Sequence, residues 1–303
     1  MPQHITVVSY DPVWNLKFKD EKQKIEAILK NDCFGVFHIG STSVKNLDAK
    51  PIIDILVVVR DLSLVDAKQT EFENLGYEYL GEFGIKGRRY LRKGGDERTH
   101  QIHVFKHDNL DEIIRHLAFR DYLRTHKDVC TEYAKLKKDL ADKFPYDING
   151  YCDGKDNFVK EHEQKALAWY DSSWDRLYFA ARSIQTKRDV SPFIVAGPVA
   201  AALMTVKGNI YTGVCIDTAC SLGMCAERNA ISTMITNGES EITKILALKA
   251  DGEIIMPCGS CRELMMQLSK DSPNIEVLID YESRAAVALG TLIPNWWGKD
   301  QFS

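Results

Sequence analysis

Three cysteines and one glutamate in the second half of the chain have the types and spacing of a metal-dependent catalytic site. Cys258 and Cys261 are three residues apart and follow Pro257, so both sulfurs face the same way on the first turn of a predicted helix. Cys225 would supply a third thiolate from a separate helix start. Three thiolates suit a tetrahedral zinc ion and leave its fourth position open for water. Glu227, two residues after Cys225, can reach over that position as a proton carrier.

Two other interpretations of these cysteines remain open. In the first, they are ordinary free thiols whose spacing coincides by chance. In the second, the zinc is purely structural, which requires a fourth ligand from the protein. The window from Leu222 to Cys261 contains no histidine, so Cys215 or Cys220 would have to close such a site.

The pattern resembles the zinc-dependent cytidine deaminase superfamily, whose signature has a glutamate two residues after the first ligand and a later Pro-Cys-x-x-Cys. A cysteine as first ligand is typical of the deaminases of free nucleosides and of blasticidin. The resemblance implies hydrolytic deamination with one zinc per chain, held by Cys225, Cys258 and Cys261. Glu227 would carry one proton of the activated water to the pyrimidine ring and, after the hydroxide adds to the amino-bearing carbon, would protonate the departing amino group. Arg228 would donate a hydrogen bond to a ligand sulfur and so offset the negative charge of three thiolates.

The same resemblance indicates where a substrate would lie. In nucleoside deaminases an Asn-x-Glu on the strand before the zinc helix holds the ribose, and Cys215 and Asp217 occupy these two positions. Because the asparagine amide is missing, we expect ordinary cytidine to bind poorly. Four further residues are candidates for substrate binding: Phe193, Ala226, Trp296 and Trp297. Phe193 is an equal candidate for the core, and the tryptophans for a subunit interface, since the resemblance also implies a homodimer or homotetramer.

A second group of candidate residues lies in the first half. The sequence predicts a strand ending at Ile39, a Gly-Ser turn, and a buried strand from Ile52 to Val59 that is interrupted by a carboxylate. Two further stretches, Tyr90–Arg92 and Gln101–Phe105, predict an antiparallel pair. The candidate site residues on these elements are His38, Gly40, Ser41, Asp54, Arg89 and His103.

These motifs, together with Tyr10-Asp11-Pro12-x-Trp14, resemble the GrpB family, a branch of the nucleotidyltransferase-like superfamily. Nucleotidyltransferases carry two aspartates at i and i+2 of one strand that hold two metal ions. Asp54 matches the first position, but the second is Leu56, and His103 is a candidate substitute. Asp54 is therefore a candidate ligand of a divalent metal. The arginines around Arg89 form either a basic rim suited to phosphate or a solvated hairpin face, and the resemblance implies nucleotide binding or nucleotidyl transfer.

The elements that must position these residues predict an α/β (α+β) protein of two domains. Residues 1–171 are expected to form a nucleotidyltransferase-like mixed sheet with helices, including a helix over Val65–Leu75. Residues 172–303 are expected to form a cytidine-deaminase-like α-β-α three-layer domain. Its first helix would be capped by Ser172 or Ser173.

The composition of the chain limits the classes of molecule that we expect it to bind. The 303 residues have a net charge of −4, which does not indicate nucleic-acid or membrane binding. Met1–Tyr10 is polar, no apolar run approaches the ~20 residues of a membrane span, and the eight cysteines favour reduced thiols in the cytoplasm. We expect a small pyrimidine nucleoside or nucleoside antibiotic as partner rather than a polynucleotide. The alternative is a nucleotide-binding or sensing protein with a structural zinc and no deaminase activity.

Overall fold

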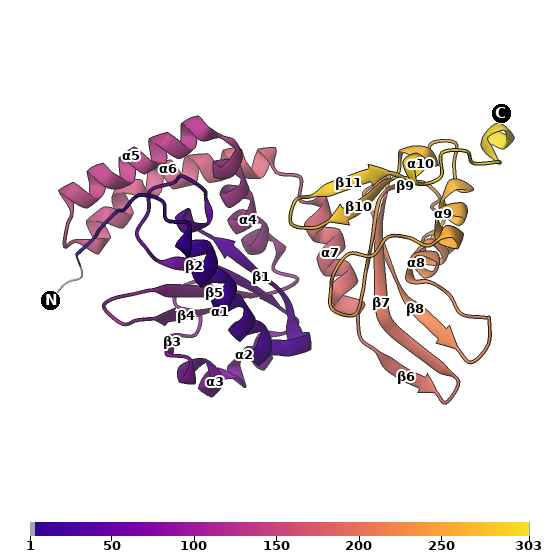
Figure 1. Ribbon diagram of the computed structural model, residues 1–303, viewed down its shortest axis with the longest axis horizontal. Helices are drawn as coiled ribbons and strands as arrows, with labels where there is room; N and C mark the ends of the chain where they lie inside the picture. The colour runs from indigo at the N-terminus through magenta and orange to yellow at the C-terminus, as the bar shows by residue number, and fades with distance from the viewer. Residues whose placement is uncertain (1–3, 303) are drawn as a thin grey trace. The chain divides into compact units, whose positions relative to one another are not determined.

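The structure is a computed structural model that describes residues 4–302 (Figure 1). The chain divides into two compact units, Met1–Asp171 and Ser172–Ser303. Each unit has its own mixed sheet with helices packed against it. The α/β (α+β) class predicted from the sequence is confirmed.

The first unit is built on a five-stranded sheet in the order β1-β2-β5-β4-β3. Strands β1 and β2 pair antiparallel, β2 and β5 pair parallel, and β4 pairs antiparallel with both β5 and β3. The bounds are β1 Cys33–Ile39, β2 Ile53–Val59, β3 Tyr77–Tyr79, β4 Arg88–Lys93 and β5 His100–Lys106. Strand β2 is an interior strand and almost wholly buried, as its run of β-branched residues predicts.

Helices cover this sheet. They are α1 Val13–Leu29, α2 Leu62–Asp66, α3 Gln69–Asn74, α4 Leu110–Thr125, α5 Lys127–Lys143 and α6 Ile148–Trp169. Helices α1 to α3 share one core with the sheet through Trp14, Val65 and Phe72. Helices α4, α5 and α6 share a second core that includes Tyr122 and Tyr133. A short 3-10 turn, η2 Ser41–Ser43, links β1 to the segment that leads into β2.

The second unit has a six-stranded sheet in the order β11-β10-β9-β7-β6, with β8 paired to β7. The bounds are β6 Arg188–Ser191, β7 Ile194–Thr205, β8 Ile210–Thr218, β9 Ile242–Leu248, β10 Glu276–Asp280 and β11 Ala285–Ala288. Strands β7 and β8 form an antiparallel hairpin. Strands β9 and β10 pair parallel, and the chain between them contains a crossover helix.

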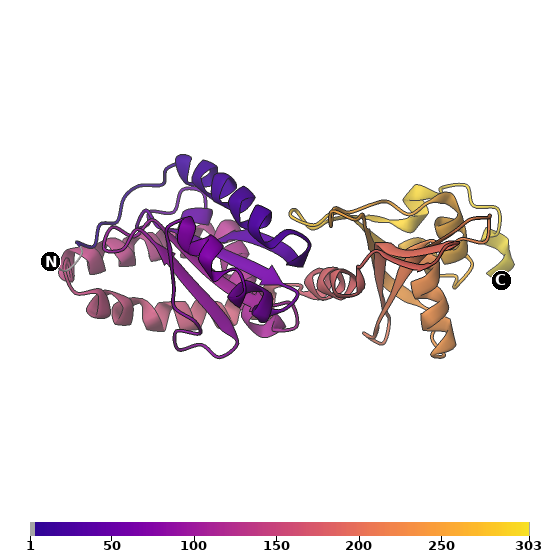
Figure 2. The same cartoon turned by 90° about the horizontal axis from the view of Figure 1, so that it is seen from below.

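Helices lie on both faces of this second sheet. They are α7 Ser173–Ile184, α8 Ala226–Thr236, α9 Gly259–Met266 and the short α10 Leu289–Leu292. Helix α7 covers one face, while α8 and α9 cover the other (Figures 1 and 2). Leu203 and Ile245 of the sheet pack with Ile231 of α8 and Met265 of α9 in one core. The three-layer arrangement predicted for this half is therefore present.

One local prediction was wrong, and another was confirmed only in part. The helix predicted over Val65–Leu75 is two short helices, α2 and α3, because the chain leaves the helix at Ala67 and Lys68. Ser172 holds the N-cap position of α7, but its side chain makes no capping hydrogen bond. Apolar spacing cannot reveal either detail, since two consecutive short helices keep the same period as one long helix.

Candidate functional site

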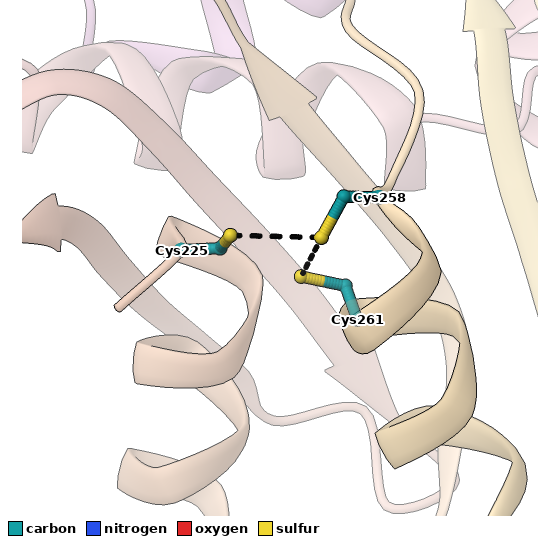
Figure 3. Close-up of side chains that lie close together, drawn as sticks. All are labelled: Cys225, Cys258 and Cys261. Atoms are coloured by element: carbon teal, nitrogen blue, oxygen red, sulfur yellow. Dashed lines mark hydrogen bonds between the residues drawn. The ribbon is translucent and has the colours of Figure 1, made fainter. Parts of the chain in front are cut away.

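Three cysteine sulfurs converge where α8 and α9 begin (Figure 3). Cys225 and Cys258 hold the N-cap positions of α8 and α9, and Cys261 lies in the first turn of α9. The Sγ atoms of Cys225 and Cys258 are 3.6 Å apart, and those of Cys258 and Cys261 are 3.5 Å apart. All three sulfurs lie within 4.8 Å of one another.

This spacing fits a zinc ion. Three sulfurs at tetrahedral angles, each about 2.3 Å from zinc, are about 3.8 Å apart. The cluster is the one group of three or more metal-binding side chains found among residues 4–302, and neither Cys215 nor Cys220 belongs to it. The fit therefore has three protein ligands and no fourth.

The pKa values of the three cysteine thiols determine how many protons a metal ion would displace on binding. Burial raises the pKa of Cys261 and of Cys225. Burial acts the same way on Cys258, but hydrogen bonds from the backbone N–H groups of Cys261 and Ser260, at the start of α9, outweigh it and lower its pKa. Because a ligating cysteine is a thiolate, zinc binding here must release protons.

Glu227 is the second residue of α8 and lies beside the triad. Its side chain is buried, with 5% of its surface exposed, and burial raises its carboxyl pKa. It lines a cavity of about 320 Å³ together with Cys225 and Cys258. Substrate pockets measure roughly 300–1,000 Å³, so this one has room for a small ligand within reach of both the sulfurs and the carboxylate.

Three other predicted residues line the same cavity: Cys215, Asp217 and Ala226. The thiol of Cys215 accepts a hydrogen bond from the backbone N–H of Val199 at 3.4 Å and donates one to Asp217 Oδ2 at 3.7 Å. Cys215, at the position that is asparagine in nucleoside deaminases, is therefore a weak hydrogen-bond donor that already has Asp217 as its acceptor. The cavity wall at this point cannot offer an amide to a ligand.

Arg228 also lines this cavity, but its predicted contact with a ligand sulfur is not formed. Its guanidinium donates to the backbone oxygen of Gly223 at 3.2 Å. The guanidinium therefore secures the loop that precedes Cys225.

Phe193, Trp296 and Trp297 do not line the cavity. Phe193 lies in the turn between β6 and β7 with 70% of its surface exposed, so it is neither a core residue nor a pocket residue within this chain. Trp296 and Trp297 each donate an indole N–H to Glu263 of α9 at 3.0 Å. Their predicted role in binding substrate therefore has no support within one chain.

Sequence reasoning missed part of the cavity wall. Pro198 and Val199 line it from β7, and Met256 lines it from the loop before α9. The pairing of β7 with β8 shifts register between Ala196 and Ala200. A Gly-Pro pair inside a strand is a known sign of such a bulge, so Gly197-Pro198 was the available signal.

In the first unit, two of the six candidates share a small cavity. Asp54 and Ser41 line a space of about 120 Å³. Gly40 turns the chain beside them with φ +67°, and a Cβ at Gly40 would meet Asp54 Oδ2 at 2.3 Å. Burial raises the pKa of Asp54 to about 6.

The other three candidates do not line this cavity. His38 stacks on Phe18 and hydrogen-bonds Thr42 at 3.0 Å, and burial lowers its pKa to about 3. Arg89 pairs with Asp66 at 2.6 Å. His103, although beside Leu56 in register, contacts Arg88 and His116.

A divalent metal at Asp54 is therefore not supported. Within residues 4–302, Asp54 belongs to no group of three metal-binding side chains. His103 does not complete a ligand set with it.

Comparison with known proteins matches each half of the chain to a different family. The family model described as "GrpB protein" matches residues 4–165, more than half of the chain. The model described as "Cytidine and deoxycytidylate deaminase zinc-binding region" matches residues 174–274. In the part of the chain that the structure describes, no helix is long and apolar enough to cross a membrane.

Individual relatives follow the same division. The UPF0157 protein YqkA of Bacillus subtilis is 42% identical over 165 residues, which cover 54% of this chain and 48% of that protein, so the chain spans about half its length. The crystal structure of the conserved protein GrpB from Enterococcus faecalis is 53% identical with a TM-score of 0.53, and the match covers 54% of this chain and 98% of that chain. A cytidine deaminase of Mycobacterium tuberculosis is 28% identical over 103 residues, covering 34% of this chain and 74% of that protein.

Proposed function

The chain belongs to the GrpB family and carries a cytidine-deaminase-type zinc-binding region behind its GrpB part. From this premise we propose that residues 172–303 are a zinc-dependent hydrolytic deaminase of a cytosine-containing nucleoside or a related pyrimidine. One observation carries the proposal: the three sulfurs and the buried carboxylate of Glu227 meet at one cavity, with no fourth protein ligand beside them.

The residues of the site divide the chemistry between them. Cys225, Cys258 and Cys261 would hold the zinc, and a zinc ion with one open position supplies an activated water near neutral pH. Glu227 would take one proton from that water and give it to the ring nitrogen as the hydroxide adds to the amino-bearing carbon. It would then move the second proton, from the added hydroxyl group, to the amino nitrogen, so that the C–N bond breaks and ammonia leaves behind a carbonyl group. Its raised pKa suits a group that must both accept and release a proton near neutral pH.

The cavity wall favours a substrate other than plain cytidine. Asp217 keeps a carboxylate for a hydroxyl group, but Cys215 replaces an amide by a thiol that already donates to Asp217. A sugar hydroxyl bound there would lose a partner, which costs about 1–3 kcal/mol. We therefore expect a substrate with fewer hydroxyl groups, or another substituent at that point.

The alternative function is nucleotide binding or sensing with a structural zinc. It requires a fourth protein ligand, and the cluster of the described residues has three. The observed donor set therefore favours the enzyme. For the GrpB part we propose nucleotide binding, and for the whole chain a homo-oligomer, whose interface the exposed Trp297 would suit.

Ammonia release tests the proposal, with zinc quantified on the same sample. Cytidine, deoxycytidine and blasticidin S are compared as substrates for the wild type and Glu227→Gln. We expect about one zinc per chain in both proteins and a fall in kcat of about 10²–10⁴-fold in the variant. Zinc-loaded wild type that releases ammonia from none of these pyrimidines, or a variant of equal activity, would contradict the proposal.

A further inference from the structure

The small cavity in the first unit is lined mainly by cations and aromatic residues. It lies where the η2 turn, the start of β2, and helices α5 and α6 meet. Its lining residues include three lysines, two tyrosines and a single acidic side chain: Lys50, Lys137, Lys155, Tyr133, Tyr151 and Asp54. These residues come from β2, the segment before it, α5 and α6, so the fold itself assembles this group of charges.

The three lysines lack the partners that normally balance buried charge. Lys137 is 3% exposed, yet its ammonium donates only to neutral oxygens, Ser41 Oγ at 2.9 Å and the backbone oxygen of Asp48. The carboxylate of Asp48 pairs instead with Lys138. Within residues 4–302, none of the three lysines forms an ion pair with a carboxylate.

Aromatic rings hold the ammonium groups in place. Lys137 Nζ lies 4.5 Å from the ring centre of Tyr133, and Lys50 and Lys155 lie 5.0 and 5.4 Å from that of Tyr151. Tyr151 is itself buried, with 1% exposed. Cation–π contacts stabilise a charge by about 0.5–2 kcal/mol, which is less than the several kcal/mol that burial costs.

The charge of Lys137 is therefore poorly compensated in the unliganded protein. Burial first, and the positive charge of Lys155 second, lower its pKa to about 7. A lysine with a purely structural role would be stabilised by a carboxylate partner. An anion in the cavity would supply that missing partner to all three lysines at once.

We propose that this cavity binds a phosphate dianion without a metal ion, either as inorganic phosphate or as the phosphate of a phosphomonoester. Three ammonium groups match the charge and the several acceptor oxygens of such a group. The volume of about 120 Å³ is below the roughly 300 Å³ of a whole-ligand pocket. The cavity therefore takes the phosphate alone, and any ester group extends outward.

The surroundings of Asp54 agree with an anion rather than a metal. Its i+2 neighbour is the apolar Leu56, and the three nearby lysines repel a divalent cation. With its amide oriented to satisfy all partners, Gln101 donates to Asp54 Oδ1 at 3.2 Å and accepts from Arg98 at 3.1 Å. Asp54 thus holds the side chain of Gln101 in place at the wall of the cavity. It is the one group there that would repel the ligand while charged.

Calorimetric titration of the full-length protein tests the proposal, in a buffer without divalent cations. Inorganic phosphate and glycerol 3-phosphate are the probes, because neither contains a base that could enter the pyrimidine site. Lys155→Gln removes one charge from a half-buried position on α6. Lys160→Gln is the matched control, since Lys160 lies on the same helix but is 73% exposed and pairs with Asp156.

We expect saturable binding of at least one probe, weakened about tenfold or more by Lys155→Gln, as the loss of one charged hydrogen bond implies. Lys160→Gln should bind as the wild type does. Asp54→Asn should bind equally well or more tightly, because it removes a like charge. Preference for glycerol 3-phosphate would indicate a phosphomonoester as ligand, and preference for phosphate the free ion.

Three results would overturn the proposal. The first is the absence of binding by either probe. The second is equal weakening by Lys155→Gln and Lys160→Gln, which would indicate diffuse attraction to surface charge. The third is binding that requires added magnesium and is lost in Asp54→Asn, which would identify a metal site.

Discussion

Replacing Gly213 by alanine tests whether the contact of β8 with α8 sets the position of the metal ligands. Gly213 lies in β8 directly against α8. A Cβ there would lie 2.3 Å from the backbone nitrogen of Ala230 and 2.6 Å from the backbone oxygen of Ala226. Both atoms belong to the helix backbone, so no rotation of a side chain can relieve the clash.

The size of the effect follows from these distances. Ordinary contact begins near 3.4 Å, so strand and helix must separate by about 1 Å. Overpacking of this kind costs about 1–3 kcal/mol. Helix α8 carries Cys225 and Glu227 at its start, and zinc–ligand distances tolerate only about 0.2 Å. We therefore expect the variant to unfold more easily and to bind zinc about tenfold or more weakly.

Competition with a chromophoric chelator measures the zinc affinity, and thermal unfolding of the same zinc-loaded samples measures the stability. Gly259→Ala is the steric control, because the same methyl group would enter open space on α9. If Gly213→Ala equals the wild type in both measurements, the strand does not position α8, and our account of how the fold holds the ligands is wrong.

Three further predictions concern charge and metal. Burial lowers the pKa of His38 to about 3 from 6.5, so below pH 6.5 the unfolded chain binds a proton that the folded chain does not, and stability falls as pH falls. We expect His38→Gln to reduce that loss by about 1.4 kcal/mol per pH unit between pH 6.5 and 4, as urea unfolding at pH 7 and 5 would measure. Chelation of zinc should lower the Tm of the wild type but leave that of Cys261→Ser unchanged, because the variant lacks a thiolate ligand; equal shifts would mean that zinc is bound elsewhere. Asp175→Ala should cost about 1–3 kcal/mol in urea unfolding, because the fully buried carboxylate accepts from Arg284 at 2.6 Å, and an unchanged midpoint would show that this pair contributes no stability.

Prediction from the sequence succeeded where the residues of a site are brought together by one element or by one pair of strands. Cys258 and Cys261 meet because they share one helical turn, and Glu227 lies beside Cys225 because only one residue separates them at the start of α8. Gly40 lies against Asp54 because it follows Ile39, which pairs directly with Asp54 across β1 and β2. In each case, backbone geometry within an element or a tight pairing brings the residues together.

Prediction failed where position depends on packing between distant segments. Phe193 has a large apolar side chain of the kind that usually packs in a core, but the tight turn between β6 and β7 exposes it. Arg89 was expected on a basic rim, but its guanidinium pairs with the carboxylate of Asp66, 23 residues away in the chain. Lys137 contacts Ser41 across 96 residues of chain, and no pattern on α5 distinguishes it from a solvated lysine.

The most direct test of the central claim, an open three-thiolate zinc site, is X-ray absorption spectroscopy of the zinc-loaded protein. We predict three sulfurs at about 2.3 Å and one oxygen or nitrogen at about 2.0–2.2 Å. Glu227→Gln should leave this shell unchanged, because Glu227 is not a ligand. Four sulfurs around the zinc would mean that Cys215 or Cys220 closes the site, and would contradict the proposed deaminase.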